Sequence, residues 1–294
     1  MENHSRLSDG CPDLQFSCAT RFYCCTRVPD NGQFVGRTCR LGRNLGTASA
    51  ASTASRIVGG QPTSIEQYPS IVQVEFLGVF TNTWSQSCAA NIINNFYVLS
   101  AAHCFAGIFY DRSRRRIRGG SSFRNIGGEV IGIVREFNHP DYNIIPGDAD
   151  INVVRLSAPI IYNPVMQRAM IVPQDYEIPD NMPVVHAGWG AIEWQGPLSF
   201  QLQDVTIYTV NRQICAERYL TLDPPRQITE NMICAGILDV GGKDACQADS
   251  GGPMYLGDII VGVVAWGHRC ANDTFPGVST AVGPYSDWIV ATAV

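Results

Sequence analysis

Short apolar runs separated by turn residues are the feature of this sequence that most restricts its fold. The run IVQVEF at 71–76 alternates apolar residues with the polar Gln73 and Glu75, which predicts a strand with one buried and one solvated face. Similar short runs follow at 129–137, 151–156, 183–190, 205–210 and 258–266. Gly, Pro, Asn and Asp fill the gaps, so the sequence predicts an all-β fold built as sandwiches or barrels. The segments 211–220 and 285–294 are predicted to be helical.

The charge balance bears on two kinds of partner, nucleic acid and anionic membranes. Charged residues make up 16% of the 294 residues and the formal net charge is −5. This balance argues against nucleic acid or an anionic membrane as the main partner. No apolar run approaches the length of a membrane span. The chain therefore reads as a globular protein.

Eleven cysteines are many for this length, and none forms a zinc-type CxxC pair. They predict disulfides and a secreted, extracellular protein. Two N-glycosylation sequons, at Asn3 and Asn272, agree with that prediction. The first ten residues contain no apolar segment, so no signal peptide is visible, and we expect an export signal that this sequence does not include.

Composition divides the chain near residue 56. Residues 41–55 are small and polar, without hydrophobic periodicity, and predict a flexible linker. We therefore expect a cysteine-rich pro-segment with its linker at 1–56 and a second domain at 57–294. The pro-segment holds five cysteines, whose pairing the sequence leaves open: Cys11, Cys18, Cys24, Cys25 and Cys39. Their spacing weakly resembles the six-cysteine clip modules of insect proteases, and an ordinary cysteine-rich propeptide is the alternative.

Three residues of the second domain suggest nucleophilic catalysis. His103 lies in LSAAHC, Asp150 enters an apolar strand in DADINVV, and Ser250 lies in CQADSGGP. Taken singly, they could be a packed histidine, a turn aspartate and a loop serine. Together they supply a hydroxyl, a base to take its proton and a buried acid to orient that base, in the chain order of one known catalytic triad.

These segments resemble the trypsin/chymotrypsin family of serine proteases. RIVGG at 56–60, HPDYN at 139–143, GWG at 188–190, AWG at 265–267 and PGVSTAV at 276–282 match in the same order. The resemblance implies two packed six-stranded antiparallel β-barrels with a short C-terminal helix and a cleft between the barrels. His103 would be the general base, Asp150 its orienting acid and Ser250 the nucleophile. It also implies the disulfides Cys88–Cys104, Cys215–Cys234 and Cys246–Cys270.

The resemblance also assigns residues around the nucleophile. Ala248 and Ser250 would supply the N–H groups of the oxyanion hole. Asp244 would lie at the base of the specificity pocket and favour substrates with Arg or Lys before the scissile bond, although a solvated loop acid is the alternative. Three further substrate-binding residues are expected, namely Trp266, Gly267 and Gly277.

Three positions depart from the family pattern. Ala248 replaces a glycine, Ala265 replaces a serine that contacts the triad aspartate, and Ser279 stands where a tyrosine is common. These changes predict a slower or more selective enzyme. The region of the vertebrate calcium loop keeps the single acid Glu129, a poor calcium site, so we expect no metal and no cofactor.

Arg56-Ile57 resembles the zymogen activation bond of the family. Cleavage would free the α-amino group of Ile57, which would insert and pair with Asp249. We therefore expect a secreted serine endopeptidase made as a zymogen, with protein and peptide substrates, an activating protease and protein inhibitors as partners. The alternative is a weakly active or non-catalytic homologue that acts as a binding module. The cysteine-rich segment favours a cascade role and the plain barrel loops favour digestion.

Overall fold

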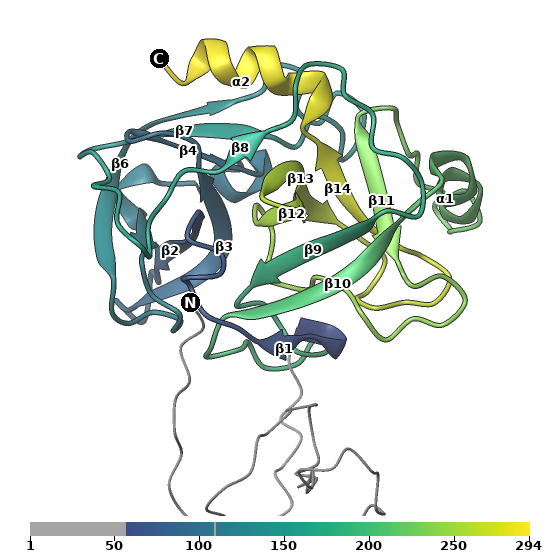
Figure 1. Cartoon of the computed structure of the whole chain (residues 1–294), viewed down its shortest axis with the longest axis horizontal. Coiled ribbons are helices and arrows are strands. Elements are labelled where there is room, and N and C mark those ends of the chain that lie inside the picture. The colour runs from purple at the N-terminus through teal and green to yellow at the C-terminus, as the bar shows by residue number, and fades with distance from the viewer. Residues whose placement is uncertain (1–56, 109) are drawn as a thin grey trace, which may run out of the picture. The chain divides into compact units, whose positions relative to one another are not determined.

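A computed structural model describes residues 57–108 and 110–294. The predicted pro-segment at 1–56, its five cysteines and Arg56 therefore lie outside the described residues. Figure 1 shows the described part as two β-barrels lying side by side, with the amino-terminal barrel in purple and teal and the carboxyl-terminal one in green and yellow. This architecture confirms the expected all-β double-barrel fold.

The first barrel is a closed ring of six antiparallel strands in the order β2-β3-β4-β7-β6-β5. Its strands are β2 (Ile71–Leu77), β3 (Trp84–Ile92), β4 (Tyr97–Ser100), β5 (Arg115–Gly119), β6 (Glu129–Asn138) and β7 (Asn152–Leu156). Pairing of β5 with β2 closes the ring. Short 3-10 helices follow β4 and precede β5, namely η2 (Ala102–Phe105) and η3 (Arg112–Arg114).

The second barrel is also a ring of six antiparallel strands, in the order β9-β10-β11-β14-β13-β12, and pairing of β9 with both β10 and β12 closes it. Its strands are β9 (Pro183–Gly188), β10 (Gln203–Val210), β11 (Met232–Gly236), β12 (Pro253–Leu256), β13 (Ile259–Trp266) and β14 (Gly277–Ala281). Two short strands lie beside the ring: β1 (Gln61–Pro62) pairs with β10, and β8 (Met170–Ile171) runs parallel to β13.

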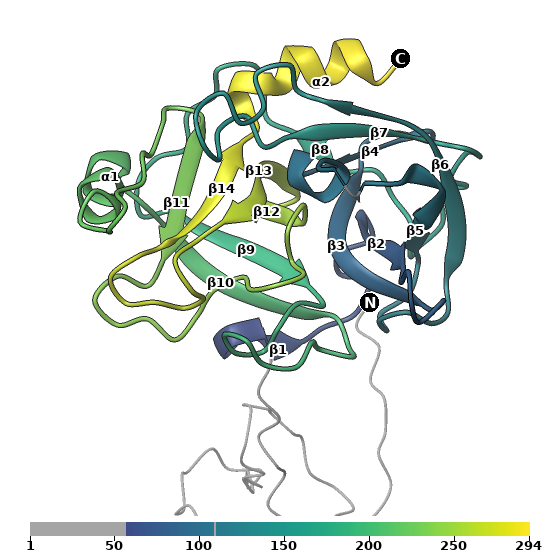
Figure 2. The same ribbon diagram turned by 180° about the vertical axis from the view of Figure 1, so that it is seen from behind.

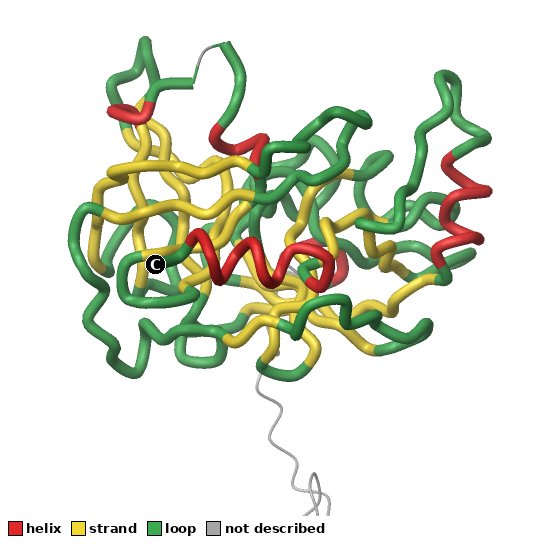
Figure 3. Tube along the Cα trace, turned by 90° about the horizontal axis from the view of Figure 1, so that it is seen from above, coloured by secondary structure: helices red, strands yellow, loops and turns green. Residues whose placement is uncertain are grey.

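Both predicted helices are present. Helix α1 (Arg212–Tyr219) begins where the Asn211 side chain accepts the N–H groups of the first turn, the usual role of an N-cap asparagine. Helix α2 (Ser286–Thr292) follows the short 3-10 helix η4 (Gly283–Tyr285) and lies across the top of the molecule in Figure 1. In Figure 3, which is seen from above, it crosses the middle of the view. No helix among the described residues has the length and apolar character needed to cross a bilayer.

The end of the chain returns from the second barrel to the first. Tyr97 Oη donates to the carbonyl of Val294 at 2.6 Å, and Asn94 Nδ2 donates to the carbonyl of Ala293 at 2.8 Å. Figure 2 shows the same crossing from behind. One contiguous apolar core, which includes Leu99 of the first barrel and Val263 of the second, runs through both barrels. The two barrels are therefore anchored to each other.

The prediction of a solvated face on the strand at 71–76, which is β2, is wrong. Gln73 and Glu75 of β2 are 1% and 0% exposed. Gln73 bonds the loop at 123–125 through its amide, and the Glu75 carboxylate accepts from both Arg116 and Arg118 on the paired strand β5. Polar residues therefore occupy a covered face because each has a partner there.

Candidate active site

The pairing of β4 with β7 brings His103 and Asp150 together. Ser100 at the end of β4 lies opposite Asn152 at the start of β7, so the segments that carry the histidine and the aspartate leave the sheet side by side. His103 Nδ1 lies 2.6 Å from Asp150 Oδ2, and the His103 backbone N–H donates to Oδ1 at 2.8 Å. Asp150 is 3% exposed. The buried carboxylate thus fixes both the backbone and the ring of the histidine.

Ser250, the expected nucleophile, comes from the second barrel and precedes β12. Its carbonyl accepts from the N–H of Ala89 in the first barrel at 2.8 Å. Cys104 Sγ lies 3.7 Å from His103 Nε2 and 3.7 Å from the Ser250 carbonyl, so the histidine and the serine share a neighbour. No hydrogen bond joins Ser250 Oγ to His103 in this structure. Such bonds are often long before substrate binds and shorten in the complex.

Asp249 organises the backbone around Ser250. Its Oδ1 accepts the Gly190 N–H at 2.7 Å and its Oδ2 accepts the Cys246 N–H at 2.9 Å. Its side chain is 1% exposed, and burial raises the pKa of Asp249 to about 7. The N–H groups of Ala248 and Ser250, on either side, bond no acceptor in the described part of the chain. An oxyanion hole requires such unbonded N–H groups, so the assignment of Ala248 and Ser250 to this role stays a prediction.

Ala248 has φ +73, in the left-handed region that favours glycine. The Gln86 amide donates to its carbonyl at 2.6 Å, which ties this turn to β3 of the first barrel. Sequence reasoning missed Gln86, because an amide inside a strand carries no distinctive signal. The backbone of Ala248 is therefore strained, because it carries a methyl group at a left-handed φ. The sequence alone does not give this backbone angle.

A pocket of about 190 Å³ opens beside Ser250 and is lined by Asp244, Trp266, Gly267 and Gly277 among others. Asp244 is 5% exposed, and burial raises the pKa of its carboxyl to about 7. Its Oδ2 accepts the N–H of Ala271 at 3.2 Å. A side chain on Gly277 would start 2.6 Å from Asp244 Oδ1, so only glycine leaves the carboxylate accessible from this wall.

Ala265 and Ser279 line the same pocket. The Asp150 carboxylate accepts hydrogen bonds from His103 alone among the described residues, so nothing stands in for the serine hydroxyl that Ala265 lacks. Ser279 is 2% exposed within β14 and adds no bulk to the pocket wall. The two departures therefore remove one support from Asp150 and leave the pocket open.

The structure contains the three disulfides that the resemblance implied. Cys88–Cys104 lies beside His103 and Cys246–Cys270 lines the pocket, whereas Cys215–Cys234 joins α1 to β11 away from the site. Among the described residues, one group of metal-ligand types lies close together, namely Cys88, His103 and Cys104. Both cysteines are bonded to each other and leave a single nitrogen. Glu129 lies exposed in β6. The absence of a metal remains a prediction.

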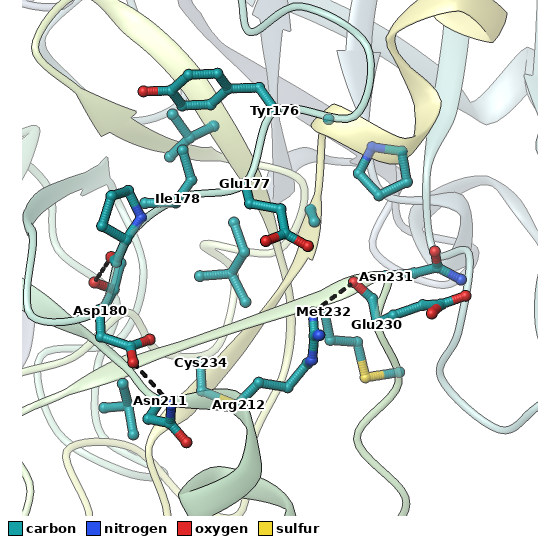
Figure 4. Close-up of a pocket in the computed structure, with 18 of the residues that line it drawn as sticks. Tyr176, Glu177, Ile178, Asp180, Asn211, Arg212, Glu230, Asn231, Met232 and Cys234 are labelled. Carbon is teal, nitrogen blue, oxygen red and sulfur yellow. Dashed lines mark hydrogen bonds between the residues drawn. The ribbon is translucent and has the colours of Figure 1, made fainter.

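A larger hollow of about 660 Å³ has a different set of lining residues, most of which are drawn in Figure 4. Glu177, Asp180 and Glu230 contribute carboxylates to it, and Arg212 reaches the carbonyl of Glu230 at 3.5 Å. The expected catalytic residues do not line this hollow. Of the two pockets, the smaller one is the one that the expected nucleophile Ser250 lines.

A double β-barrel with a buried aspartate in contact with a histidine, and a serine from the opposite barrel, defines the chymotrypsin-like class of serine protease fold. The family described as Trypsin matches residues 57–289. The chain is 44% identical to "Trypsin, alkaline B" of Manduca sexta, over 83% of this chain and 95% of that protein. It is 41% identical to "Trypsin CFT-1" of Choristoneura fumiferana, over 84% and 94% of the two chains. It is 35% identical to "Vitellin-degrading protease" of Bombyx mori, over 83% and 90%.

The chain belongs to the trypsin family and is a trypsin-like serine endopeptidase. Its substrates are therefore proteins or peptides.

Proposed function

We propose that this protein is the secreted zymogen of an endopeptidase that cleaves after Arg or Lys. The observation that carries this proposal is the buried carboxylate of Asp244 at the pocket beside Ser250. A buried carboxylate without a cation is unfavourable. A substrate guanidinium or ammonium would supply the missing charge and charge-assisted hydrogen bonds. Ionised substrate and ionised pocket thus stabilise each other, which an apolar substrate side chain would not do.

The proposed reaction is peptide hydrolysis in which Ser250 attacks, His103 transfers the proton and Asp150 orients the histidine. His103 donates its Nδ1–H to Asp150, which leaves the Nε2 lone pair free to accept a proton. Ser250 Oγ attacks the scissile carbonyl carbon and its proton passes to Nε2. The carbonyl oxygen becomes an oxyanion beside the N–H groups of Ala248 and Ser250. Histidine then protonates the leaving amine, and water releases the acyl group by the same steps in reverse.

Activation would depend on the bond between Arg56 and Ile57. The short helix η1 (Ile57–Gly59) lies against the pocket loop, where the Asp244 N–H donates to the Val58 carbonyl at 3.2 Å. Asp249 is buried without a cation among the described residues. A new ammonium group at Ile57 would pair with it and hold the oxyanion site in place. Cleavage would thereby supply the cation that the Asp249 carboxylate lacks among the described residues of the uncut chain.

The direct test compares the wild-type chain with Arg56→Gln, each treated with a trace of trypsin. We expect the wild type to gain an Ile57 amino terminus and activity on Arg-containing peptides, while Arg56→Gln gains neither. A peptide that differs only by Phe in place of Arg should be cleaved poorly. Full activity without a new Ile57 terminus would refute activation by this cut. Equal cleavage of the Phe and Arg peptides would refute the proposed specificity.

We expect an activating protease as one partner, because the uncut chain would lack the ammonium at Ile57. Protein inhibitors that present an Arg or Lys to the Asp244 pocket are a second expected class of partner. The alternative is a weakly active or non-catalytic homologue, which Ala248 and Ala265 favour. The contact of His103 with Asp150 and the similarity to trypsins favour the enzyme.

A further inference from the structure

Arg226 lies on the indole ring of Trp266, which lines the pocket beside Ser250. Its guanidinium carbon is 3.7 Å from the centre of the ring. Tyr219 packs edge-on against the same indole, with ring centres 5.1 Å apart. Trp266 lines the pocket together with Asp244 and Ser250. A cation is therefore held in a defined place next to the proposed substrate site.

The charge of Arg226 has no partner in the described part of the chain. Its side chain forms no ion pair or hydrogen bond there, whereas Arg112 binds Glu136 and Arg218 binds Asp239. Partial burial lowers the pKa of Arg226 from its ordinary value, which reflects incomplete hydration of the guanidinium. An incompletely hydrated cation gains more from an incoming carboxylate than a fully solvated one.

The backbone beside Trp266 is open to a substrate strand. Pairing of β13 with β12 ends at Val263, and Val264 bonds the loop at 251–252. The other side of β13 stays paired with β14 up to Trp266. An extended peptide can add to such an edge. If it adds antiparallel with its cleaved residue beside Ser250, the residues before the scissile bond run along Trp266 and Gly267.

We propose that Arg226 is a specificity-determining residue that favours an acidic side chain upstream of the scissile bond, where the substrate passes Trp266. This inference rests on the proposed cleavage after Arg or Lys. A carboxylate would pair with the guanidinium across the indole. A cationic side chain would be repelled, and a large apolar side chain would have to displace Arg226 from the ring. Asp244 would thus bind a cationic substrate side chain in the pocket, while Arg226 would bind an anionic one beside Trp266.

The test uses the activated protein and four-residue peptides that end in Arg and a chromogenic amide. Glu, Gln, Leu or Lys is placed in turn at each of the three positions before the Arg, with Ala at the others. At one of the upstream positions, we expect kcat/KM for Glu to exceed that for Gln by about five-fold, the scale of one partly exposed charge pair. Lys at that position should be the poorest substrate, and added salt should reduce the difference.

Two variants and one control assign the effect. Arg226→Gln should make the Glu and Gln peptides equal while it retains cleavage of the all-Ala peptide. Arg226→Lys should retain a reduced preference, because charge remains but the planar stacking is lost. Arg168→Gln, which removes the same charge from an exposed position, should keep the full preference.

Equal kcat/KM for Glu and Gln at all three positions in the wild type would overturn the inference. An unchanged preference in Arg226→Gln would overturn it as well. The all-Ala peptide separates this failure from failure of the proposed function. If that peptide is cleaved without any Glu preference, only the inference on Arg226 is wrong, whereas lack of cleavage of every Arg peptide would reject both.

Discussion

The backbone N–H of Gly190 donates to Oδ1 of Asp249 at 2.7 Å, in a space that only glycine leaves open. A side chain at Gly190 would overlap both carboxylate oxygens of Asp249, and one at Gly188 would overlap Oδ1. The GWG segment is therefore a cradle for this carboxylate. Because Asp249 lies between Ala248 and Ser250, its bonds to Gly190 and Cys246 hold the turn that carries their two N–H groups.

The uncleaved chain should lose stability as the pH rises from about 4 to about 7. The pKa of Asp249 is about 7 in the folded chain and about 4 in an unfolded one, so the folded chain holds the extra proton between these values. The free energy of unfolding then falls with rising pH over that range. Asp249→Asn should weaken this dependence. Thermal unfolding of uncleaved Ser250→Ala chains, with and without Asp249→Asn, measures it.

Asp258→Asn is the control, because Asp258 is exposed and its loss removes the same formal charge. The comparison between variants is needed because His186 acts in the opposite direction. Burial lowers the pKa of His186 to about 4, so its contribution to stability is lost as the pH falls from about 6.5. Equal pH dependence in Asp249→Asn and in the parent chain would show that Asp249 is not a titrating buried group.

Ala248→Gly should raise both stability and kcat. The backbone of Ala248 has φ +73, which costs a residue with a side chain about 1–2 kcal/mol relative to glycine. Relief of that strain would let the N–H reach the developing oxyanion, with a gain in kcat of up to about ten-fold. The affinity for a ground-state ligand should change little. An unchanged or lower kcat would mean that the site has adapted to the methyl group.

Affinity for a cationic ligand of the pocket should rise with pH through about 7. Burial raises the pKa of Asp244 to about 7 in the empty pocket, and only the ionised carboxylate pairs with a substrate cation. The inhibition constant of a small aromatic amidine at several pH values measures this. Asp244→Ser should remove the pH dependence and reduce the preference for Arg over Phe by about a thousand-fold. An amidine affinity that is constant between pH 5 and 9 would contradict the prediction.

Residues 1–56 should separate from the enzyme after activation. The six cysteines downstream of residue 57 are all used in the disulfides of the two barrels. None is left to hold the pro-segment, and an odd number of cysteines upstream leaves one without a partner in its own segment. Electrophoresis of the activated protein without reductant should show a shortened chain. A single band near the intact mass, which divides only on reduction, would reveal a cross-chain disulfide.

The sequence predicted the parts of this protein that follow from periodicity and motif. The strand runs, both helices and the double barrel agree with the structure, and Asp150 is buried with a partner, as its place at the start of an apolar strand suggested. The prediction for Gln73 and Glu75 is wrong, because alternation of polar and apolar residues cannot show which polar side chains find buried partners. Only the fold brings Arg116 and Arg118 to Glu75.

Two further features of the site could not be predicted from the sequence, for a different reason. The strain at Ala248 is a backbone angle, which residue type alone does not fix. The contact of Arg226 with Trp266 joins residues that are far apart in the sequence and carry no shared motif. Motifs therefore identified the candidate triad, while the surroundings that would set rate and selectivity came from tertiary packing.

Covalent labelling tests the central claim most directly. A diphenyl phosphonate that carries an Arg-like side chain should react with the activated protein, as Ser250 Oγ displaces phenoxide from phosphorus. Mass spectrometry should find one adduct, on Ser250, and none on Ser250→Ala or on the uncleaved chain. His103→Ala should react far more slowly, because no base takes the serine proton. If the folded, activated wild type forms no adduct on Ser250, this residue is not the nucleophile and the proposed mechanism is wrong.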